Sequence, residues 1–319
     1  MLETGFVRSK WNETFRAAVV AGLSRPRKTL APCWLYDERG SQLFEQITRL
    51  DDYYPTRAET EILLRHAGEI ARFCGEETLL FEYGAGAGIK TEILIAALDR
   101  PRLYVPIDIA GDFLARTVRR IERRFPDLEV FPVVADFNHD FELPDLPAGR
   151  RTAFFPGSTI GNLNHAEAAA FLRRLRRHVG KQGMAVIGVD LKKDVRMLID
   201  AYDDRDGVTA AFNLNLLARI NRELDGDFPL DRFAHEARWN ASESAIEMHL
   251  VSLDERQVAV CGEHFAFEAG ETIHTESSRK YDLDIFAALA ESTGWRATKV
   301  WLDRNHHFAV FGLETWSHD

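Results

Sequence analysis

Short apolar runs alternate with longer amphipathic stretches in the middle of the chain, between Leu79 and Asp190. The apolar runs, which predict strands buried on both faces, are Leu79–Tyr83, Leu103–Ile107, Val130–Val134, Ala153–Phe155 and Met184–Val189. The stretches between them, which have apolar residues at helical spacing, are Lys90–Ala97, Asp112–Arg124 and His165–His178. This alternation is typical of βαβ units and predicts an α/β fold with a parallel sheet covered by helices on both faces.

Two regions do not follow this alternation. Residues 1–70 have a helical pattern interrupted at Pro26, Pro32 and Pro55. Residues 205–280 begin with a predicted helix and continue with alternating apolar positions typical of strands. The predicted elements here are the helix Ala211–Leu224 and the strands Phe233–Trp239, Ala245–Leu253 and Gln257–Phe267.

The end of the chain returns to the α/β pattern, with a predicted helix over Asp282–Thr293 and strands over Ala297–Asp303 and Phe308–Leu313. The simplest interpretation is one α/β core, residues 61–195 and 281–319, interrupted by an insertion. We expect residues 1–60 and 196–280 to form an additional α+β lobe over the sheet. Ligands of open α/β sheets bind outside the carboxyl ends of the strands, and such a lobe would close that side.

Composition narrows the class of protein. The 319 residues contain 40 Lys and Arg against 50 Asp and Glu, a net charge of −10, and an acidic surface repels phosphate backbones. We therefore expect no nucleic-acid partner. The apolar runs are too short to span a membrane, and the first 25 residues are interrupted by charges such as Glu3 and Arg8, unlike a signal peptide.

Cysteine and histidine spacing argue against disulfides and metal sites. Cys33, Cys74 and Cys261 lie far apart and form no CxxC pair, which fits a reducing compartment. None of the 11 histidines falls in an HxH or HxxxH pattern. We expect a monomeric cytoplasmic enzyme without a metal and without a membrane partner.

The strongest local motif is a glycine-rich segment after the first apolar run, with Gly84, Gly86 and Gly88 in GxGxG spacing. Glycines let a backbone approach a ligand and adopt positive φ. The dinucleotide fingerprint needs glycine where Ile89 stands, so the spacing suits a nucleoside without a pyrophosphate. Asp108 follows Gly88 by twenty residues, at the end of the next run, where a carboxylate can accept hydrogen bonds from ribose hydroxyls.

A further acid and aromatic pair, Asp136 and Phe137, follows the third run. The acid can accept from an adenine amino group and the aromatic ring can stack on the base. Each signal alone has a structural alternative, tight packing for the glycines and a helix cap for the acids. In this order at three successive strand ends, they indicate S-adenosylmethionine (SAM).

A second loop follows the fourth run and reads Gly157-Ser-Thr-Ile-Gly-Asn162. Two glycines and an amide after an aromatic strand suit a loop whose backbone contacts a ligand. The alternative is an ordinary turn in which Asn162 and Asn164 act as caps.

Four segments together resemble one family, the L-histidine Nα-methyltransferases of ergothioneine biosynthesis, whose product is the trimethylated betaine hercynine. The resemblance extends from about Thr29 to Leu313. It rests on Leu35-Tyr-Asp-Glu-Arg-Gly-Ser41, Asp52-Tyr-Tyr-Pro-Thr-Arg57, the Gly157–Asn162 loop and Thr275-Glu-Ser-Ser278. It implies a Rossmann-like SAM-dependent methyltransferase core with the α+β lobe as substrate-binding lobe, and SAM as cofactor.

The resemblance also implies roles for individual residues. The methyl donor would be bound by Gly84, Gly86, Lys90, Asp108, Asp136 and Phe137. The amino-acid substrate would be bound by Tyr53, Gly157, Asn162, Tyr202, Phe212, Met248, Glu276, Ser277 and Ser278. Within this set Asn162 and Tyr202 would hold the carboxylate, and Tyr53, Glu276 and Ser278 would face the imidazole. Tyr36, Tyr53 and Asn162 are the candidate catalytic residues.

Relatives in the wider family methylate other amino acids, including indole-bearing ones. Glu276 and Met248 favour imidazole, because a carboxylate is a poor wall for an indole. Two alternatives stay open: a methyltransferase acting on another amino acid or small amine, and a non-catalytic nucleoside-binding protein. The sequence indicates no general base.

Overall fold

A computed structural model describes residues 2–86, 88–109 and 111–316. The chain divides into two compact units. Unit 1 comprises Met1–Tyr53 and Asp194–Ser278, and unit 2 comprises Tyr54–Lys193 and Arg279–Asp319. Within the described ranges, no helix is long and apolar enough to cross a membrane.

Unit 2 is built on an eight-stranded sheet in the order β13-β14-β7-β6-β2-β3-β4, with β5 also paired to β3. Its strands are β2 (Leu79–Tyr83), β3 (Leu103–Asp108), β4 (Glu129–Val130), β5 (Val133–Val134), β6 (Arg151–Phe155), β7 (Met184–Asp190), β13 (Trp295–Leu302) and β14 (Phe308–Thr315). The pairs from β4 to β7 are parallel, whereas β14 runs antiparallel to both β7 and β13. The chain leaves β2 toward β3 and β4 and then returns to β6 on the other side, which is the Rossmann-like arrangement.

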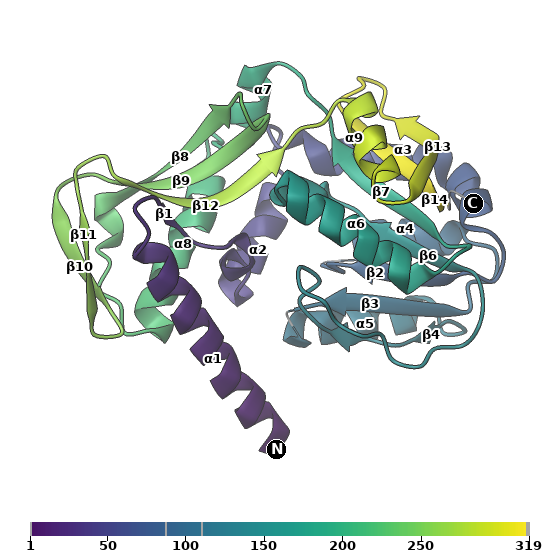
Figure 1. Cartoon of the computed structure of the whole chain (residues 1–319), viewed down its shortest axis with the longest axis horizontal. Coiled ribbons are helices and arrows are strands. Elements are labelled where there is room, and N and C mark those ends of the chain that lie inside the picture. Colours follow the sequence, from purple (N-terminus) through teal and green to yellow (C-terminus); the bar gives the residue numbers. More distant parts are fainter. Residues whose placement is uncertain (1, 87, 110, 317–319) are drawn as a thin grey trace. The chain divides into compact units, whose positions relative to one another are not determined.

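Helices cover both faces of this sheet because its strands are apolar on both sides. Alternate residues of β2 enter different cores: Leu79 and Phe81 pack with α6 and α9, and Leu80 packs with α3 and α4. Figure 1 shows α6 in front of the sheet. The helices are α3 (Tyr54–Cys74), α4 (Ile89–Ala97), α5 (Gly111–Arg124), η2 (Thr159–Asn162), α6 (His165–Val179) and α9 (Leu283–Glu291).

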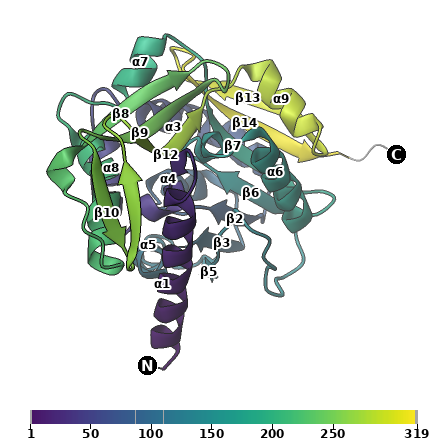
Figure 2. The same cartoon turned by 60° about the vertical axis from the view of Figure 1, so that its left-hand side comes forward.

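Unit 1 contains a four-stranded sheet in the order β1-β12-β9-β8 and a separate β10–β11 hairpin. Its strands are β1 (Lys28–Thr29), β8 (Phe233–Asn240), β9 (Ala245–Ser252), β10 (Arg256–Val260), β11 (Glu263–Phe267) and β12 (Thr272–Arg279). Figure 2 shows β8, β9 and β12 side by side. The helices are α1 (Leu2–Leu23), η1 (Pro32–Leu35), α2 (Glu38–Ile47), α7 (Val195–Asp200), α8 (Val208–Glu223) and η3 (Leu230–Arg232). Of these, α8 packs against α2, β8 and β9.

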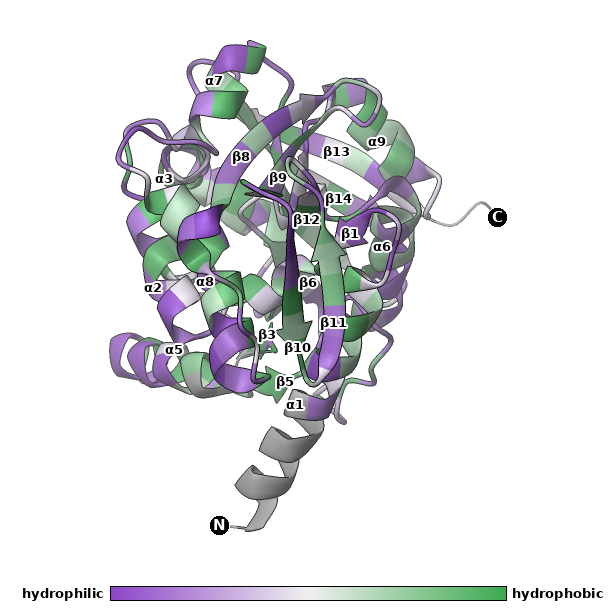
Figure 3. Ribbon diagram, turned by 90° about the vertical axis from the view of Figure 1, so that its left-hand side faces the viewer, coloured by the Kyte–Doolittle hydropathy of each residue, from purple (hydrophilic) through white to green (hydrophobic). Residues whose placement is uncertain are grey.

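The structure corrects two predicted strands. The run Val130–Val134 forms two short strands, β4 and β5, because Pro132 lies between them and has no N–H for the ladder. The run Gln257–Phe267 is a hairpin rather than one strand. It turns at Cys261 and Gly262, which both have positive φ, as a two-residue type I′ turn requires. Figure 3 shows hydrophobic and hydrophilic residues along this hairpin, and Val258 and Phe265 are among those it buries.

Candidate active site

The glycine-rich segment lies at the carboxyl end of β2, where the order of strands reverses, and leads directly into α4. Gly84 has φ +73° and Gly88, the N-cap of α4, has φ +65°, conformations that residues with a Cβ rarely adopt. A Cβ on Gly84 would lie 3.4 Å from the Phe137 ring. The backbone of Gly84 and the aromatic ring therefore lie together, as a nucleoside site requires. Ala87, within this motif, lies outside the described residues.

Asp108 ends β3 beside the same loop. Its Oδ2 accepts the Gly86 N–H at 3.3 Å, so these two predicted donor residues are in contact. Phe137 packs edge-on against Phe155 and Phe171, with centroids 5.6 and 5.8 Å away. Asp136 accepts the backbone N–H of Asn138 at 2.9 Å and lies 2.8 Å from a ring nitrogen of His139. The structure thus joins Gly84 to Phe137 and Gly86 to Asp108.

Lys90 and Gly157, predicted from separate motifs, meet at a residue that sequence analysis missed. Glu59 on α3 is completely buried. Its carboxylate accepts the Gly157 N–H at 2.8 and 3.0 Å and pairs with the Lys90 ammonium. A buried charge is tolerated only when paired and hydrogen-bonded, so Glu59 holds the start of α4 and the loop after β6 together. The available signal was an acid on the apolar stripe of α3, between Ala58 and Ile62.

Asn162 ends η2, the short 3₁₀ helix after the Gly157 loop. Backbone atoms of Arg279 pack against this segment, since a Cβ on Gly161 would lie 2.7 Å from the Arg279 carbonyl oxygen. The Arg279 guanidinium also donates to the Leu163 carbonyl at 3.0 Å. These contacts fix the backbone on both sides of Asn162.

Glu82, next to the glycine loop, is a second buried acid. Its carboxylate accepts from Thr91 Oγ1 at 2.7 Å and from the Tyr104 hydroxyl. Burial raises the pKa of Glu82 to about 8, although these two hydrogen bonds oppose the rise. Burial therefore favours the protonated form of Glu82.

Unit 1 contains the predicted substrate residues other than Gly157 and Asn162, and several of them form an aromatic cluster. The cluster comprises Tyr36, Phe44, Tyr53 and Phe212. Phe44 contacts the other three rings, and Tyr36 also contacts Phe212, with ring centroids 5.4 to 6.3 Å apart in these edge-on or tilted pairs. The Tyr53 ring is also edge-on to Tyr202 at 5.9 Å. Sequence analysis missed Phe44, because a Phe on a short amphipathic helix also fits an ordinary core position.

β12 and β9 carry further predicted substrate residues of unit 1. The Tyr202 and Ser278 hydroxyls lie 2.7 Å apart. Glu276 is buried, with 7% of its surface exposed, and Met248 is buried on β9. Thr275 Oγ1 donates to the Met248 carbonyl at 3.0 Å, which fixes β12 beside β9 at this level. The Ser277 hydroxyl has a different neighbour from that of Ser278, since it lies 3.0 Å from Nε2 of His274.

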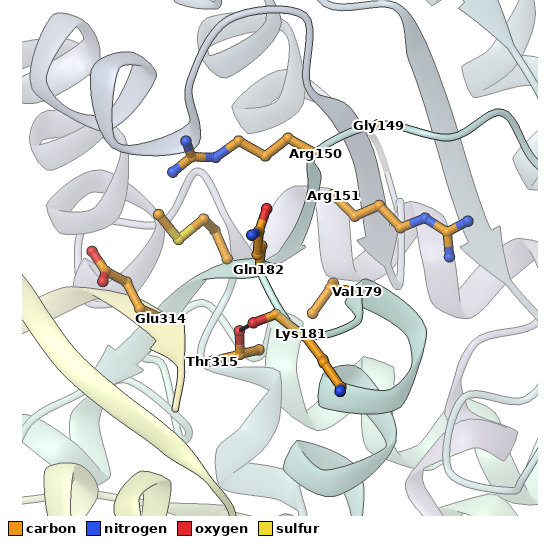
Figure 4. Close-up of a pocket in the computed structure, with 10 residues that line it drawn as sticks. Gly149, Arg150, Arg151, Val179, Lys181, Gln182, Glu314 and Thr315 are labelled. Carbon is orange, nitrogen blue, oxygen red and sulfur yellow. Dashed lines mark hydrogen bonds between the residues drawn. The ribbon is translucent and has the colours of Figure 1, made fainter. Parts of the chain in front are cut away.

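A cavity of about 610 Å³ lies at the amino ends of strands β6 and β7 of the unit 2 sheet. Arg151, at the amino end of β6, contributes to its lining (Figure 4). Met184, at the amino end of β7, is also a lining residue. The glycine loop and the Gly157 loop follow the carboxyl ends of the strands instead. This cavity is therefore separate from the predicted donor residues.

Comparison with known proteins gives a consistent result. The family model described as histidine-specific, SAM-dependent methyltransferase matches residues 15–315. The chain is 41% identical to histidine N-alpha-methyltransferase of Mycobacterium tuberculosis, covering 92% of this chain and 93% of that protein. It is 42% identical to the enzyme of the same name from Mycolicibacterium smegmatis, covering 93% and 94%. It is 28% identical to ergothioneine biosynthesis protein 1 of Neurospora crassa, covering 90% of this chain but 34% of that protein.

Proposed function

The chain belongs to the family of histidine-specific, SAM-dependent methyltransferases, and on this premise we propose that it transfers three methyl groups in succession to the α-amine of L-histidine. The product is hercynine, a betaine. The names of its relatives, two histidine N-alpha-methyltransferases and an ergothioneine biosynthesis protein, support this proposal. The chain is a SAM-dependent N-methyltransferase.

The residues at the carboxyl edge of the unit 2 sheet fit the donor. Gly84 and Gly86 present backbone without Cβ atoms, and Asp108 stands at the Gly86 N–H where a ribose could be bound. Phe137 would stack on the adenine and Asp136 would accept from its amino group. Lys90 would bring a positive charge to the donor's carboxylate. When bound, SAM supplies a methyl group already activated on a sulfonium, so the protein does not have to build a nucleophile.

The observation that most supports histidine as substrate is the buried polar set of unit 1. Glu276 is a buried acid on β12, the strand that also carries Ser278 of the Tyr202–Ser278 hydroxyl pair and that lies next to β9 with Met248. A buried carboxylate favours a ligand that donates an N–H to it, because a hydrogen bond to an ionised acceptor is stronger than one between neutral groups. Imidazole offers that N–H. We assign Glu276 and Ser278 to the ring and Asn162 and Tyr202 to the α-carboxylate.

The remaining task of the protein is to orient the amine and to tolerate its growing charge. The α-amine must present a lone pair to the methyl group, and fixing that geometry supplies much of the catalysis. Each transfer leaves a larger ammonium group. The rings of Tyr36 and Tyr53 offer negative π faces that stabilise such a cation without a fixed base. We assign no residue to proton removal and leave the proton of the amine to water.

Product analysis of purified protein with SAM and L-histidine tests the proposal. We expect products heavier by one, two and three CH₂ units, with fragmentation placing every added methyl on the α-nitrogen. Histamine is the matched comparison, because it keeps the ring and amine but lacks the carboxylate. We expect its kcat/KM to be lower by several orders of magnitude, as when a site's polar groups lose their partner. Methylation of the ring, or equal turnover of histamine, would contradict these assignments.

A further inference from the structure

Asp190, the last residue of β7, is a buried carboxylate that the predicted reaction does not use. The Tyr54 hydroxyl donates to its two oxygens at 2.9 and 2.8 Å. The Lys193 ammonium lies 2.6 Å from Oδ1, and the Lys280 ammonium lies 2.7 Å from Oδ2. Lys193 also donates to the Tyr54 hydroxyl at 2.6 Å and lies over that ring. One acid thus binds Tyr54 and Lys280, which are distant from it in the sequence, and Lys193, which is three residues away.

These partners stand where the chain passes between the two units. It crosses between Tyr53 and Tyr54, between Lys193 and Asp194, and between Ser278 and Arg279. Tyr54 and Lys193 are the unit 2 residues at the first two crossings, and Lys280 lies one residue beyond the third. Asp190 therefore fixes, on unit 2, all three segments by which the chain enters or leaves that unit.

Two of these segments carry predicted substrate residues. Tyr54 directly follows Tyr53, and Lys280 is two residues after Ser278. The Asp190 backbone N–H also donates to Ser158 Oγ at 2.8 Å, and Ser158 is the N-cap of the η2 turn that ends at Asn162. Consecutive Cα atoms are about 3.8 Å apart, so a shift of Tyr54 moves Tyr53 directly, and a shift of Lys280 reaches Ser278 through one intervening residue.

The burial of these charges indicates that the Asp190 cluster fixes the positions of its members more than it stabilises the fold. The Asp190, Lys193 and Lys280 side chains are at most 6% exposed, and a buried ion pair often stabilises a fold less than apolar residues of similar volume. Burial lowers the pKa of Lys193 to about 8, although Asp190 opposes that change. The cluster therefore need not add to stability to hold its members in one defined arrangement.

We propose that Asp190 is a positioning residue for substrate binding, which it supports by fixing Tyr54, Lys193 and Lys280 and, through its backbone, Ser158. This proposal rests on the proposed function, because the residues it positions are those assigned to histidine. It assigns Asp190 no contact with the substrate or with the donor. It predicts a selective loss of substrate affinity when the attachments are broken.

Three variants test the proposal. Asp190→Asn keeps the shape of the side chain but removes the charge. Tyr54→Phe removes a single hydroxyl and can still be measured if Asp190→Asn does not fold. Tyr281→Phe is the matched control. It also removes one hydroxyl from a buried tyrosine of unit 2, and the described contacts of the Asp190 carboxylate do not include that hydroxyl.

For Tyr54→Phe we expect the KM for histidine to rise about tenfold, which corresponds to about 1.4 kcal/mol, with kcat changed less than KM. The Kd for S-adenosylhomocysteine should stay within about twofold of the wild-type value. Hydrogen–deuterium exchange should become faster in peptides covering residues 50–58 and 276–282. The control Tyr281→Phe should leave the KM and the exchange in these peptides unchanged.

An unchanged KM and unchanged exchange in Tyr54→Phe would overturn the proposal, as would an equal loss of nucleoside affinity, which would indicate general damage. Failure of the proposed function is a separate outcome, in which the wild-type enzyme does not methylate histidine. Exchange in Tyr54→Phe still decides in that case whether the Asp190 cluster fixes these segments, since that measurement needs no substrate.

Discussion

Asp108 is the residue for which the donor assignment makes the simplest prediction. Its carboxylate lies at the end of β3 beside the Gly86 N–H. Asp108→Ala should weaken binding of the methyl donor by about 1.5–3 kcal/mol, the usual value for a hydrogen bond to a charged group. Titration calorimetry with S-adenosylhomocysteine measures this. Asp127→Ala, at an exposed turn of the same unit, is the control, and unchanged affinity in Asp108→Ala would remove Asp108 from the site.

Glu276 determines the choice of substrate in the proposed function. Glu276→Ala should cost histidine about 1.5–3 kcal/mol of binding or transition-state stabilisation. Tryptophan should gain relative to histidine, because the buried charge that opposes an indole is gone. The measurement is the ratio of kcat/KM for histidine over tryptophan, with Glu263→Ala on the exposed side of β11 as control. A ratio that stays within about threefold would refute this role, since the effect expected is about tenfold or more.

The raised pKa of Glu82 predicts that the stability of the fold depends on pH. Its pKa is about 8 in the folded chain, against an ordinary value of 4.5. Between these values the folded state retains a proton that the unfolded state has lost, so the contribution of Glu82 is present below about pH 4.5 and is lost as the pH rises through 8. Glu82→Gln resembles the protonated acid and does not titrate.

Melting curves of both proteins at several pH values between about 5 and 8.5 test this dependence, which follows from proton linkage. We expect the Tm of Glu82→Gln to gain on that of the wild type as the pH rises. A difference in Tm that is the same at every pH would show that Glu82 is already ionised in the folded chain.

At the scale of elements, the contact between α3 and β7 sets the position of Glu59. A Cβ on Gly188 of β7 would lie 2.0 Å from Glu59 Oε1, so Gly188→Ala must displace a carboxylate that holds both Gly157 and Lys90. We expect a loss of about 1–3 kcal/mol in the free energy of unfolding, as for other overpacked sites, together with weaker donor binding.

Gly68→Ala is the matched control for Gly188→Ala. Gly68 lies on the exposed side of α3, where the nearest atom to an added Cβ is an Arg72 nitrogen at 3.6 Å. Alanine is the better helix former by about 1 kcal/mol, so this variant should be slightly more stable. Denaturant unfolding compares both. Equal stability of Gly188→Ala and the wild type would mean that Glu59 can move without cost.

The α/β elements could be predicted from the sequence because their pattern is strong and local. β2 and β7 are apolar apart from Glu82 and Asp190 and are buried along their whole length. α6 has a clear apolar stripe and ends at Val179, with Gly180 as its C-cap. The prediction missed β12, which carries Glu276 and Ser278. Its residues Thr272–Arg279 are nearly all polar, with only Ile273 as a large apolar residue, so neither hydropathy nor composition indicates a strand there.

The site could be predicted only where a motif marked it. The contacts between Gly84 and Phe137 and between Gly86 and Asp108 join residues from motifs that the sequence had already singled out. The Asp190 cluster could not be predicted in this way. Its partners Tyr54 and Lys280 lie 136 and 90 residues from Asp190 along the chain, and only the fold brings them together.

At the scale of the whole molecule, each of the two units carries a different part of the proposed chemistry. Unit 2 holds the glycine loop, Asp108 and Phe137, and unit 1 holds the aromatic cluster, Glu276 and the Tyr202–Ser278 pair. The assignment of the donor to residues 61–195 and 281–319, and of the substrate to residues 1–60 and 196–280, remains a prediction. The donor-binding and selectivity measurements on Asp108 and Glu276 test the two halves separately.

The central claim is that this protein alone transfers three methyl groups in succession to the α-amine of histidine. The most direct test is the amount of S-adenosylhomocysteine formed when excess SAM and a limiting, known amount of L-histidine react to completion. The proposed function predicts three moles per mole of histidine, with hercynine as the final product. A reaction that ends at one mole per mole, with monomethylated histidine accumulating, would contradict it.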